Sequence, residues 1–280
     1  MPLKSFPPLK SLSQNFLRSP ALAEKLVDLL PITKSDAVVE LGSGQGALTF
    51  LLAEKARALL AVEIDAGLSA LLREKVLESG NKNIEIRHQD LMKADWREWF
   101  AFLGGPCYVV GNLPYHISTA TLFKIIEYRD FIARAYIMLQ REVADRLVGK
   151  PGGKTYGIIT VLIGYYAEAM ALMHLGPNAF YPRPKVASTL VEISFRPSSE
   201  PVLKDEEVFK WLVRSAFGQR RKQLKNALSA GGRYDPPLLL EALEKNDIDP
   251  QDRAERLTIS QFANLANTLA ELEKKQIGSR

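Results

Sequence analysis

Short apolar runs alternate with helical stretches between about residue 19 and residue 195, and this alternation constrains the fold more than any other feature. The runs have the length and the apolar character of buried strands: Ala37–Leu41, Leu59–Ile64, Ile84–His88, Tyr108–Val110 and Ala135–Leu139. Helical patterns precede, separate and follow them: Ala21–Leu30, Ala47–Lys55, Gly67–Glu78, Thr119–Glu127 and Arg141–Val148. The alternation predicts an α/β fold with a parallel sheet and helices on both faces.

Local signals refine two helix starts and the end of this region. Ser19-Pro20 combines a capping hydroxyl with proline at the first helical position, and Ser118 is the expected N-cap of a second helix. A further helix is expected at Ile158–Tyr166. Met170–Leu175 and Thr189–Phe195 follow as a closing antiparallel hairpin.

Beyond residue 200 the pattern is helical only. The linker-like segment Arg196–Pro201 precedes four helical stretches: Glu206–Phe217, Lys222–Leu228, Leu238–Lys245 and Ser260–Leu272. We therefore expect two domains, an α/β domain over residues 1–200 and a small all-helical C-terminal domain over residues 201–280.

Composition excludes several classes of protein. No apolar run approaches the roughly 18 residues of a membrane span, and the first 17 residues lack the apolar core of a secretory signal. The sequence therefore favours a cytoplasmic protein without a membrane partner. Cys107 is the only cysteine, it lies in an apolar run, and the three histidines are scattered, so no metal site is expected.

The net charge of +5 is modest, but its distribution is uneven. Residues 1–20 contain Lys4, Lys10 and Arg18 and no acid. Residues 214–226 also lack acids and carry a basic cluster: Arg214, Arg220, Arg221, Lys222 and Lys225. Two such segments suit a surface that binds a polyanion. From charge alone, the alternative that they are ordinary solvent-exposed faces is equally good.

The first strand leads into a glycine-rich turn, Gly42-Ser43-Gly44-Gln45-Gly46, and then a helix. Glu63 lies about 20 residues further on, at the end of the second strand, where a carboxylate can bind a ribose diol. Both features fit NAD as well as S-adenosylmethionine. Two further features favour S-adenosylmethionine. Asp90 follows the third strand and suits an adenine amine, and the glycines are spaced at i, i+2 and i+4 rather than with the dinucleotide spacing.

Asn112-Leu113-Pro114-Tyr115 follows the fourth strand and faces the same edge of the sheet. The side-chain oxygen of Asn112 and the carbonyl of Leu113 can accept both N–H bonds of an aromatic amine, which directs its lone pair at an electrophilic methyl group. Pro114 stiffens the turn, and Tyr115 can stack on a base. No strong general base is needed, because positioning and electrostatics carry such a reaction.

Eight motifs resemble those of the ribosomal RNA adenine dimethyltransferases of the KsgA/RsmA type, in the order of that family and over nearly the whole chain. They are Gln14–Leu17, the glycine turn, Val62–Asp65, Asn112–Tyr115, Met138–Ala144, Ala179–Val186, Phe217–Lys222 and Asp252–Leu257. The resemblance implies a Rossmann-like class I methyltransferase sheet with a small all-helical C-terminal domain. It implies dimethylation of the N6 amines of two adjacent adenosines near the 3′ end of 16S rRNA, by a monomer acting on an immature 30S subunit.

The resemblance also assigns residues. It implies that S-adenosylmethionine is bound by Asn15, Leu17, Gly42, Glu63, Asp90 and Asn112. Asn112 and Leu113 would hold the target amine, Tyr115 and Phe180 would sandwich the base, and Arg220, Arg221 and Lys222 would bind phosphates.

The chain departs from the family pattern at three positions: Ser13 stands where glycine is usual, Ser43 where proline is usual and His116 where asparagine is usual. We interpret His116 as a polar loop residue. The related enzymes that methylate 23S rRNA and confer macrolide resistance are the nearest alternative, and they tend to carry isoleucine in place of Leu113. A DNA adenine methyltransferase fits less well, since those have Pro-Pro-Tyr in this loop. A non-enzymatic ribosome-assembly factor on the same fold is a further alternative.

Overall fold

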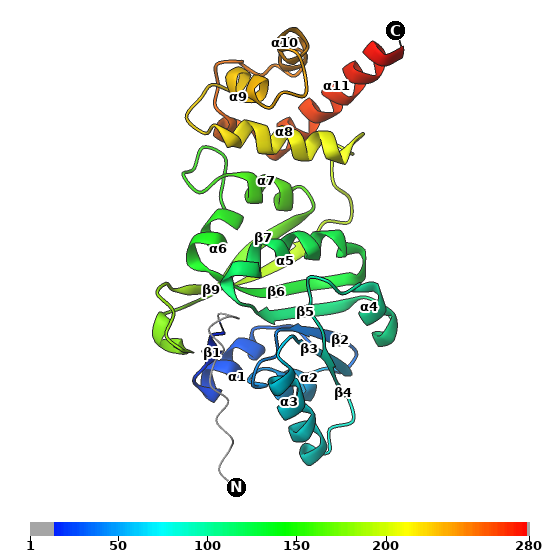
Figure 1. Ribbon diagram of the computed structural model, residues 1–280, viewed down its shortest axis with the longest axis vertical. Helices are drawn as coiled ribbons and strands as arrows, with labels where there is room; N and C mark the ends of the chain where they lie inside the picture. Colours follow the sequence, from blue (N-terminus) through cyan, green and yellow to red (C-terminus); the bar gives the residue numbers. More distant parts are fainter. Residues whose placement is uncertain (1–13, 279–280) are drawn as a thin grey trace. The chain divides into compact units, whose positions relative to one another are not determined.

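The computed structural model describes residues 14–278, and by its internal contacts the chain divides into two compact units (Figure 1). The sheet unit extends up to Ala144 and includes Ala169–Phe195. The helical unit comprises Asp145–Glu168 and the chain from Arg196 onward. Lys4, Lys10 and Ser13, which the sequence analysis names, lie outside the described residues.

Seven strands form one mixed sheet in the order β4-β3-β2-β5-β6-β9-β7. They are β2 (Ala37–Leu41), β3 (Ala58–Glu63), β4 (Ile84–His88), β5 (Cys107–Asn112), β6 (Ile132–Gln140), β7 (Ala167–Leu175) and β9 (Ser188–Phe195). The neighbours from β4 to β6 pair in parallel, and β9 runs antiparallel to β6. Every predicted strand is present, with small shifts at the ends, because strands covered on both sides read as continuous apolar runs.

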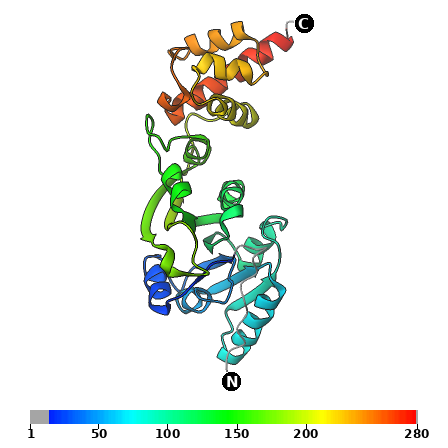
Figure 2. The same cartoon turned by 60° about the vertical axis from the view of Figure 1, so that its left-hand side comes forward.

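Helices cover this sheet. They are α1 (Pro20–Asp28), α2 (Thr49–Lys55), α3 (Ala66–Ser79), α4 (Arg97–Leu103) and α5 (Tyr115–Glu127), with 3₁₀ turns at Arg129–Phe131 and Pro177–Ala179. The next helix, α6 (Arg141–Leu147), contains the boundary between the two units. In Figure 2 the dark-blue α1 and the cyan α3 lie on opposite sides of the blue strands. Trp96 and Trp99 at the start of α4 are fully buried, so they pack in the core.

The two predicted helix starts have different outcomes. Ser19 caps α1, because its hydroxyl oxygen accepts a hydrogen bond from Leu22 N at 3.4 Å. The expected N-cap at Ser118 is wrong. The helix α5 already begins after Pro114, and the buried Ser118 hydroxyl donates to the Pro114 carbonyl oxygen at 3.2 Å, inside the first turn. Proline fixes a backbone angle that suits a helix start, and this signal prevails over the hydroxyl.

A separate two-stranded antiparallel sheet joins β1 (Phe16–Leu17) to β8 (Phe180–Tyr181). Leu17 is paired with Phe180 and Phe16 with Tyr181, and Arg18 N donates to the Ala179 carbonyl oxygen at 2.9 Å. This pairing fixes the N-terminal described segment beside a loop more than 160 residues away in the sequence.

The helical unit contains α7 (Ile158–Gly164), α8 (Glu206–Gly218), α9 (Leu224–Ala230), α10 (Pro236–Glu244) and α11 (Ile259–Gly278), with a 3₁₀ turn at Ala254–Arg256. The single boundary expected near residue 200 differs from the observed division, since residues 145–168 belong to this unit. The reason is packing. Tyr156 is fully buried, its ring lies edge-on to Phe217, and its hydroxyl donates to the Leu257 carbonyl oxygen at 2.8 Å. Within residues 14–278 no helix is long and apolar enough to cross a bilayer.

Substitution of Gly46, the last glycine of the turn, can test how tightly α2 and α3 pack. Its φ is +86°, and a Cβ there would lie 2.6 Å from Leu72 Cδ2. We predict that Gly46→Ala lowers the free energy of unfolding by about 1–3 kcal/mol, through backbone strain and crowding. Urea unfolding followed by tryptophan fluorescence measures this. Gly80→Ala is the matched control, because the φ of Gly80 is +69° and no atom lies within 4 Å of the new Cβ. Its loss of unfolding free energy should be smaller. Equal losses in the two variants would contradict the role of crowding at Gly46.

Candidate active site

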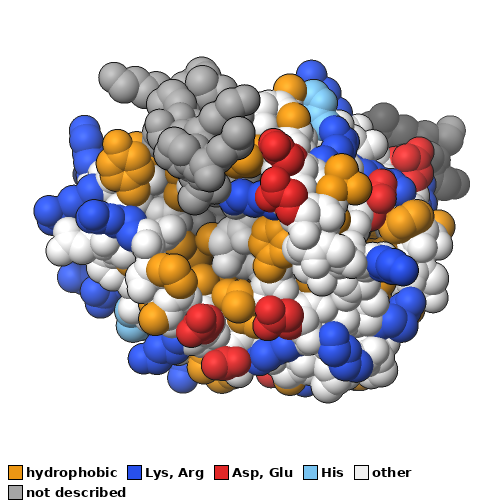
Figure 3. All heavy atoms as spheres, turned by 90° about the horizontal axis from the view of Figure 1, so that it is seen from below, with side chains coloured by type: hydrophobic (Ala, Val, Ile, Leu, Met, Phe, Trp, Pro, Cys, Tyr) orange, Lys and Arg blue, Asp and Glu red, His pale blue; other side chains and the backbone are white. Residues whose placement is uncertain are grey.

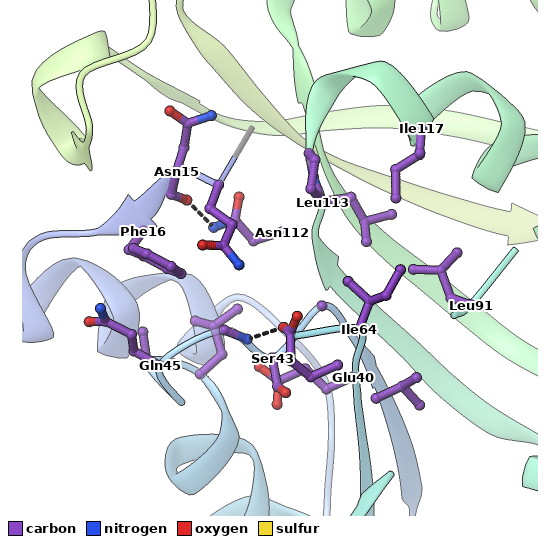
Figure 4. A pocket seen from close by; sticks show the side chains of 18 of the residues that line it. Asn15, Phe16, Glu40, Ser43, Gln45, Ile64, Leu91, Asn112, Leu113 and Ile117 are labelled. Atoms are coloured by element: carbon purple, nitrogen blue, oxygen red, sulfur yellow. Dashed lines mark hydrogen bonds between the residues drawn. The ribbon is translucent and has the colours of Figure 1, made fainter. Parts of the chain in front are cut away.

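A cavity of about 260 Å³ opens where β2, β3, β4 and β5 end (Figure 4). Six segments line it: residues 14–17, the end of β2, the glycine turn, the ends of β3 and β4, and the junction of β5 with α5. In an open α/β sheet, ligands bind at this carboxyl edge of the strands. The predicted residues that line it are Asn15, Leu17, Gly42, Glu63, Asp90, Asn112 and Leu113.

Glu63 ties the glycine turn to the end of β3. Its Oε2 accepts a hydrogen bond from Gly44 N at 2.8 Å, and its Oε1 accepts one from Asp65 N at 2.9 Å. Burial raises the pKa of this carboxyl, and the backbone N–H groups of Asp65 and Gly44 oppose the rise by stabilising the anion. Each carboxylate oxygen has a further lone pair, so Glu63 can also accept from a hydroxyl in the cavity.

Asp90 both lines the cavity and caps a turn. Its side chain lines the cavity, yet Oδ1 also accepts a hydrogen bond from Met92 N at 2.9 Å and so caps the following turn. Oδ2 lies 3.9 Å from the exposed Lys93 ammonium. The cap fixes the direction of the carboxylate, and Oδ2 remains an acceptor.

The amide of Asn112 is oriented by the N-terminal segment. Asn112 Nδ2 donates to the carbonyl oxygen of Asn15 at 3.3 Å (Figure 4), so the other end of the amide, Oδ1, is an acceptor. Leu113 is buried against the glycine turn: a Cβ on Gly42 would lie 3.3 Å from Leu113 Cδ2, and the φ of Gly42 is +73°. Glycine at position 42 therefore permits the close approach that places Asn112 and Leu113 beside the turn.

The structure does not bring the two predicted stacking residues into the cavity. Tyr115 is the first residue of α5, between the lining residues Pro114 and His116, and its hydroxyl shares a 2.8 Å hydrogen bond with the Ser188 hydroxyl. Desolvation raises the pKa of Tyr115, which therefore stays neutral. Phe180 is 1% exposed and packs in a core cluster, so its ring is not open to the cavity in this conformation, and its role in stacking stays a prediction.

His116 was interpreted as a loop residue and lies instead in the first turn of α5, exposed and at the rim of the cavity. Three apolar lining residues were not singled out from the sequence. The side chains of Ile64, Leu91 and Ile117 point into the cavity from three segments (Figure 4), and Ile64 is 45% exposed. For Ile64 the available signal was a large apolar residue directly after the strand-end Glu63.

Glu40 is the second buried carboxyl of the site and was not assigned from sequence. It is 2% exposed, lines the cavity and accepts a hydrogen bond from the Thr49 hydroxyl at 2.7 Å. Burial raises its pKa to about 7, the Thr49 hydrogen bond opposes this, and repulsion from Glu63 adds to it. An acid within an otherwise apolar strand was the signal. Two buried carboxyls at one cavity favour a cationic ligand.

Within the described residues no group of three His, Cys, Asp or Glu side chains could hold a metal ion. Cys107 is buried, and desolvation raises the pKa of its thiol to about 11, so it behaves as a small apolar residue. The predicted phosphate-binding cluster lies in the helical unit. Arg220 is engaged there, since its Nε lies 3.3 Å from Glu255 Oε2 and its Nη2 donates to the Lys154 carbonyl oxygen. Arg221 and Lys222 are exposed.

The pKa of Glu40 predicts a pH dependence of stability. A carboxyl whose pKa is raised by folding binds its proton more tightly in the folded chain, so the free energy of unfolding falls as pH rises from about 4.5 to about 7. The fall from this group is roughly 3 kcal/mol. Urea unfolding between pH 5 and pH 8 should show a flatter profile for Glu40→Gln, whereas Glu24→Gln, on the exposed face of α1, should keep the wild-type slope. Equal slopes in all three proteins would refute the prediction.

Comparison with known proteins agrees with this geometry. A model of the family described as ribosomal RNA adenine dimethylase matches residues 9–271. The ribosomal RNA small subunit methyltransferase A of Alkaliphilus oremlandii is 38% identical over 264 residues, which cover 93% of this chain and 91% of the relative. The protein of the same name from Geobacillus kaustophilus is 40% identical over 270 residues, which cover 94% and 91%.

Crystal structures agree as well. A dimethyladenosine transferase from Plasmodium falciparum superposes with a TM-score of 0.77 at 24% identity, over 93% of this chain and 98% of the other. The 23S rRNA methyltransferase ErmE gives a TM-score of 0.69 at 25% identity, over 91% and 99%. The predicted Rossmann-like methyltransferase fold is confirmed, and the chain belongs to the ribosomal RNA adenine dimethylase family.

Proposed function

We propose that the protein dimethylates the exocyclic N6 amine of two adjacent adenosines near the 3′ end of 16S rRNA, with S-adenosylmethionine as methyl donor. The observation that carries the proposal is the Asn112 amide, which Asn15 holds with its oxygen free to accept, in the same cavity as Glu63 and Asp90. The substrate is an immature 30S subunit, and the protein acts in the cytoplasm as a monomer.

The cavity fits the chemistry of S-adenosylmethionine. Glu63 suits the ribose diol, the Asp90 carboxylate suits the adenine amine, and the apolar side chain of Ile64 suits the face of the purine. The hydroxyl of Ser43, in the glycine turn, is buried and has no hydrogen-bond partner among the described residues, as expected of a polar group that a ligand completes. When bound, the cofactor supplies an electrophilic methyl group on a sulfonium.

The residues of the chain position the nucleophile. Asn112 Oδ1 and the Leu113 carbonyl oxygen accept the two N–H bonds of the adenine amine, which reduces conjugation of its lone pair with the ring. Pro114 supports this arrangement, because its own carbonyl is tied into the first turn of α5 by Ile117 N and the Ser118 hydroxyl. The leaving thioether is neutral, so the excess proton of the methylated amine can pass to water after the transfer. Orientation of the amine toward the methyl group accounts for the rate.

The family relatives distinguish the two ribosomal substrates. Relatives that are 38% and 40% identical bear a small-subunit name, whereas ErmE, which bears a 23S rRNA name, is 25% identical. Incubation with radiolabelled S-adenosylmethionine, either with 30S subunits from a strain that lacks the modification or with protein-free 23S RNA, tests the choice. Mapping the label to two adjacent adenosines of 16S rRNA is the expected result, and label confined to 23S RNA would replace this proposal by the macrolide-resistance activity.

Asn112→Ala tests the mechanism. Loss of an acceptor that positions the amine should lower kcat by about 100-fold or more. Binding of 30S subunits should persist, because other parts of the protein bind the RNA. Filter binding and single-turnover methylation measure the two quantities, and calorimetry with S-adenosylhomocysteine controls for damage to the cofactor site. A variant that methylates at the wild-type rate excludes amine positioning by Asn112.

The helical unit offers a second test. We propose that Arg221 and Lys222 bind phosphates, whereas Arg220 holds the unit together through Glu255 and the Lys154 carbonyl. Each phosphate contact contributes about 0.7–0.9 to the slope of log affinity against log salt. Arg221→Gln with Lys222→Gln should therefore reduce the slope for 30S binding by about 1.5. Lys34→Gln with Lys82→Gln removes the same charge from the exposed chain that precedes β2 and β4, and should leave the slope unchanged. Equal slopes for both pairs contradict the assignment.

A further inference from the structure

The register of the small β1–β8 sheet assigns its two aromatic residues to opposite faces. Successive residues of a strand point to opposite faces, and residues directly opposite each other on neighbouring strands share a face. Leu17 and Phe180 are such a pair, and both pack in the core. Phe16 and Tyr181 are the next pair and therefore lie on the other face.

Phe16, on that other face, lines the cavity together with Leu17. The Phe16 ring covers the glycine turn: a Cβ on Gly44 would lie 3.0 Å from Phe16 Cε1 (Figure 4). Tyr181 is directly opposite Phe16 and is 59% exposed. Of the two aromatic rings of this motif, that of Tyr181 is therefore the exposed one in this structure, whereas that of Phe180 packs in the core.

The surroundings of Tyr181 are basic. Arg18, Arg183 and Lys185 are all exposed, and within residues 14–278 none of them forms an ion pair with a carboxylate. Residues 14–23 and 169–191, which contain β1 and β8, have no Asp or Glu. Figure 3 shows Lys and Arg side chains gathered with apolar ones along the left-hand edge of this end of the molecule. Pro182 and Pro184 alternate with the exposed residues and stiffen the loop.

We propose that Tyr181, Arg18, Arg183 and Lys185 form a second RNA-binding surface, on which an unpaired base that flanks the target adenosine stacks on Tyr181. The proposal rests on the proposed function and extends it to a substrate contact outside the cavity. Cations suit the phosphates on either side of that base, and an exposed ring suits the base itself. Bases offer their faces in single-stranded loops and ends rather than in duplexes, so the surface takes an unpaired nucleotide.

The test uses a synthetic hairpin RNA with two adjacent adenosines in its loop and 2-aminopurine at the flanking position. Stacking on the wild-type protein should quench the 2-aminopurine fluorescence. Tyr181→Ala should abolish the quenching and weaken binding by about 5- to 100-fold, whereas Tyr181→Phe should retain both. Arg183→Gln with Lys185→Gln should weaken binding with a smaller salt slope. Phe102→Ala, which removes another exposed aromatic ring of the sheet unit, is the matched control and should behave as wild type.

Three results would overturn the inference: unchanged quenching in Tyr181→Ala, an equal loss in Tyr181→Phe, or a loss of affinity for S-adenosylhomocysteine in Tyr181→Ala that matches its loss for RNA. Methylation of 30S subunits that lack the modification is measured separately with the wild-type protein. Methylation of these subunits together with no effect of Tyr181→Ala on the hairpin refutes this inference and leaves the proposed function in place. Absent methylation of these subunits together with Tyr181-dependent quenching refutes the proposed function and retains the surface.

Discussion

The buried carboxylate of Glu63 connects the parts of the cavity to one another. Through Gly44 it holds the glycine turn, and through Asp65 N it holds the start of the next turn. Asp65 in turn caps α3 by accepting from Gly67 N at 2.8 Å, and it accepts from Gln14 Nε2 at 3.3 Å. One chain of hydrogen bonds thus links the glycine turn, β3, α3 and the N-terminal segment. Such a network is costly when only partly satisfied, which restricts the arrangements available to the cavity wall.

Much of this arrangement could be predicted from sequence, because the physical causes are local. The strand Ala37–Leu41 is buried at every residue, and apart from Glu40 its residues are apolar, so it can be recognised in the sequence. The glycine turn lies between a strand and a helix, and acids follow the next two strands. In a parallel sheet the turn and these acids must lie at the same edge. Six residues expected at the cofactor and the expected amine-binding Leu113 accordingly line one cavity.

The features that could not be predicted depend on pairing between distant segments of the chain. The hydrophobic periodicity of the sequence carries no information on such pairing. The motif that contains Phe180 and Tyr181 shows two adjacent aromatics, and only the pairing with Phe16 and Leu17 determines which of them is buried. Residues 145–168 were placed with the sheet because they precede β7 in sequence, yet the contacts of Tyr156 place them with α8 and the chain near Leu257. Glu40 was overlooked because an acid in an apolar strand is conspicuous only once its burial is known.

The hydrogen bond from Asn112 to Asn15 has a consequence for base identity. A carboxamide can ordinarily rotate to present either an oxygen or an amino group, and so tolerate partners of either polarity. Here the amino end is engaged by the Asn15 carbonyl, so only the oxygen is offered. In the proposed reaction, inosine or guanosine carries a keto group at position 6 of the purine. The keto oxygen would then lie against the Asn112 oxygen, and neither atom can donate a hydrogen bond. In that reaction the discrimination between amino and keto purines would therefore depend partly on the backbone carbonyl of Asn15, the residue directly before β1.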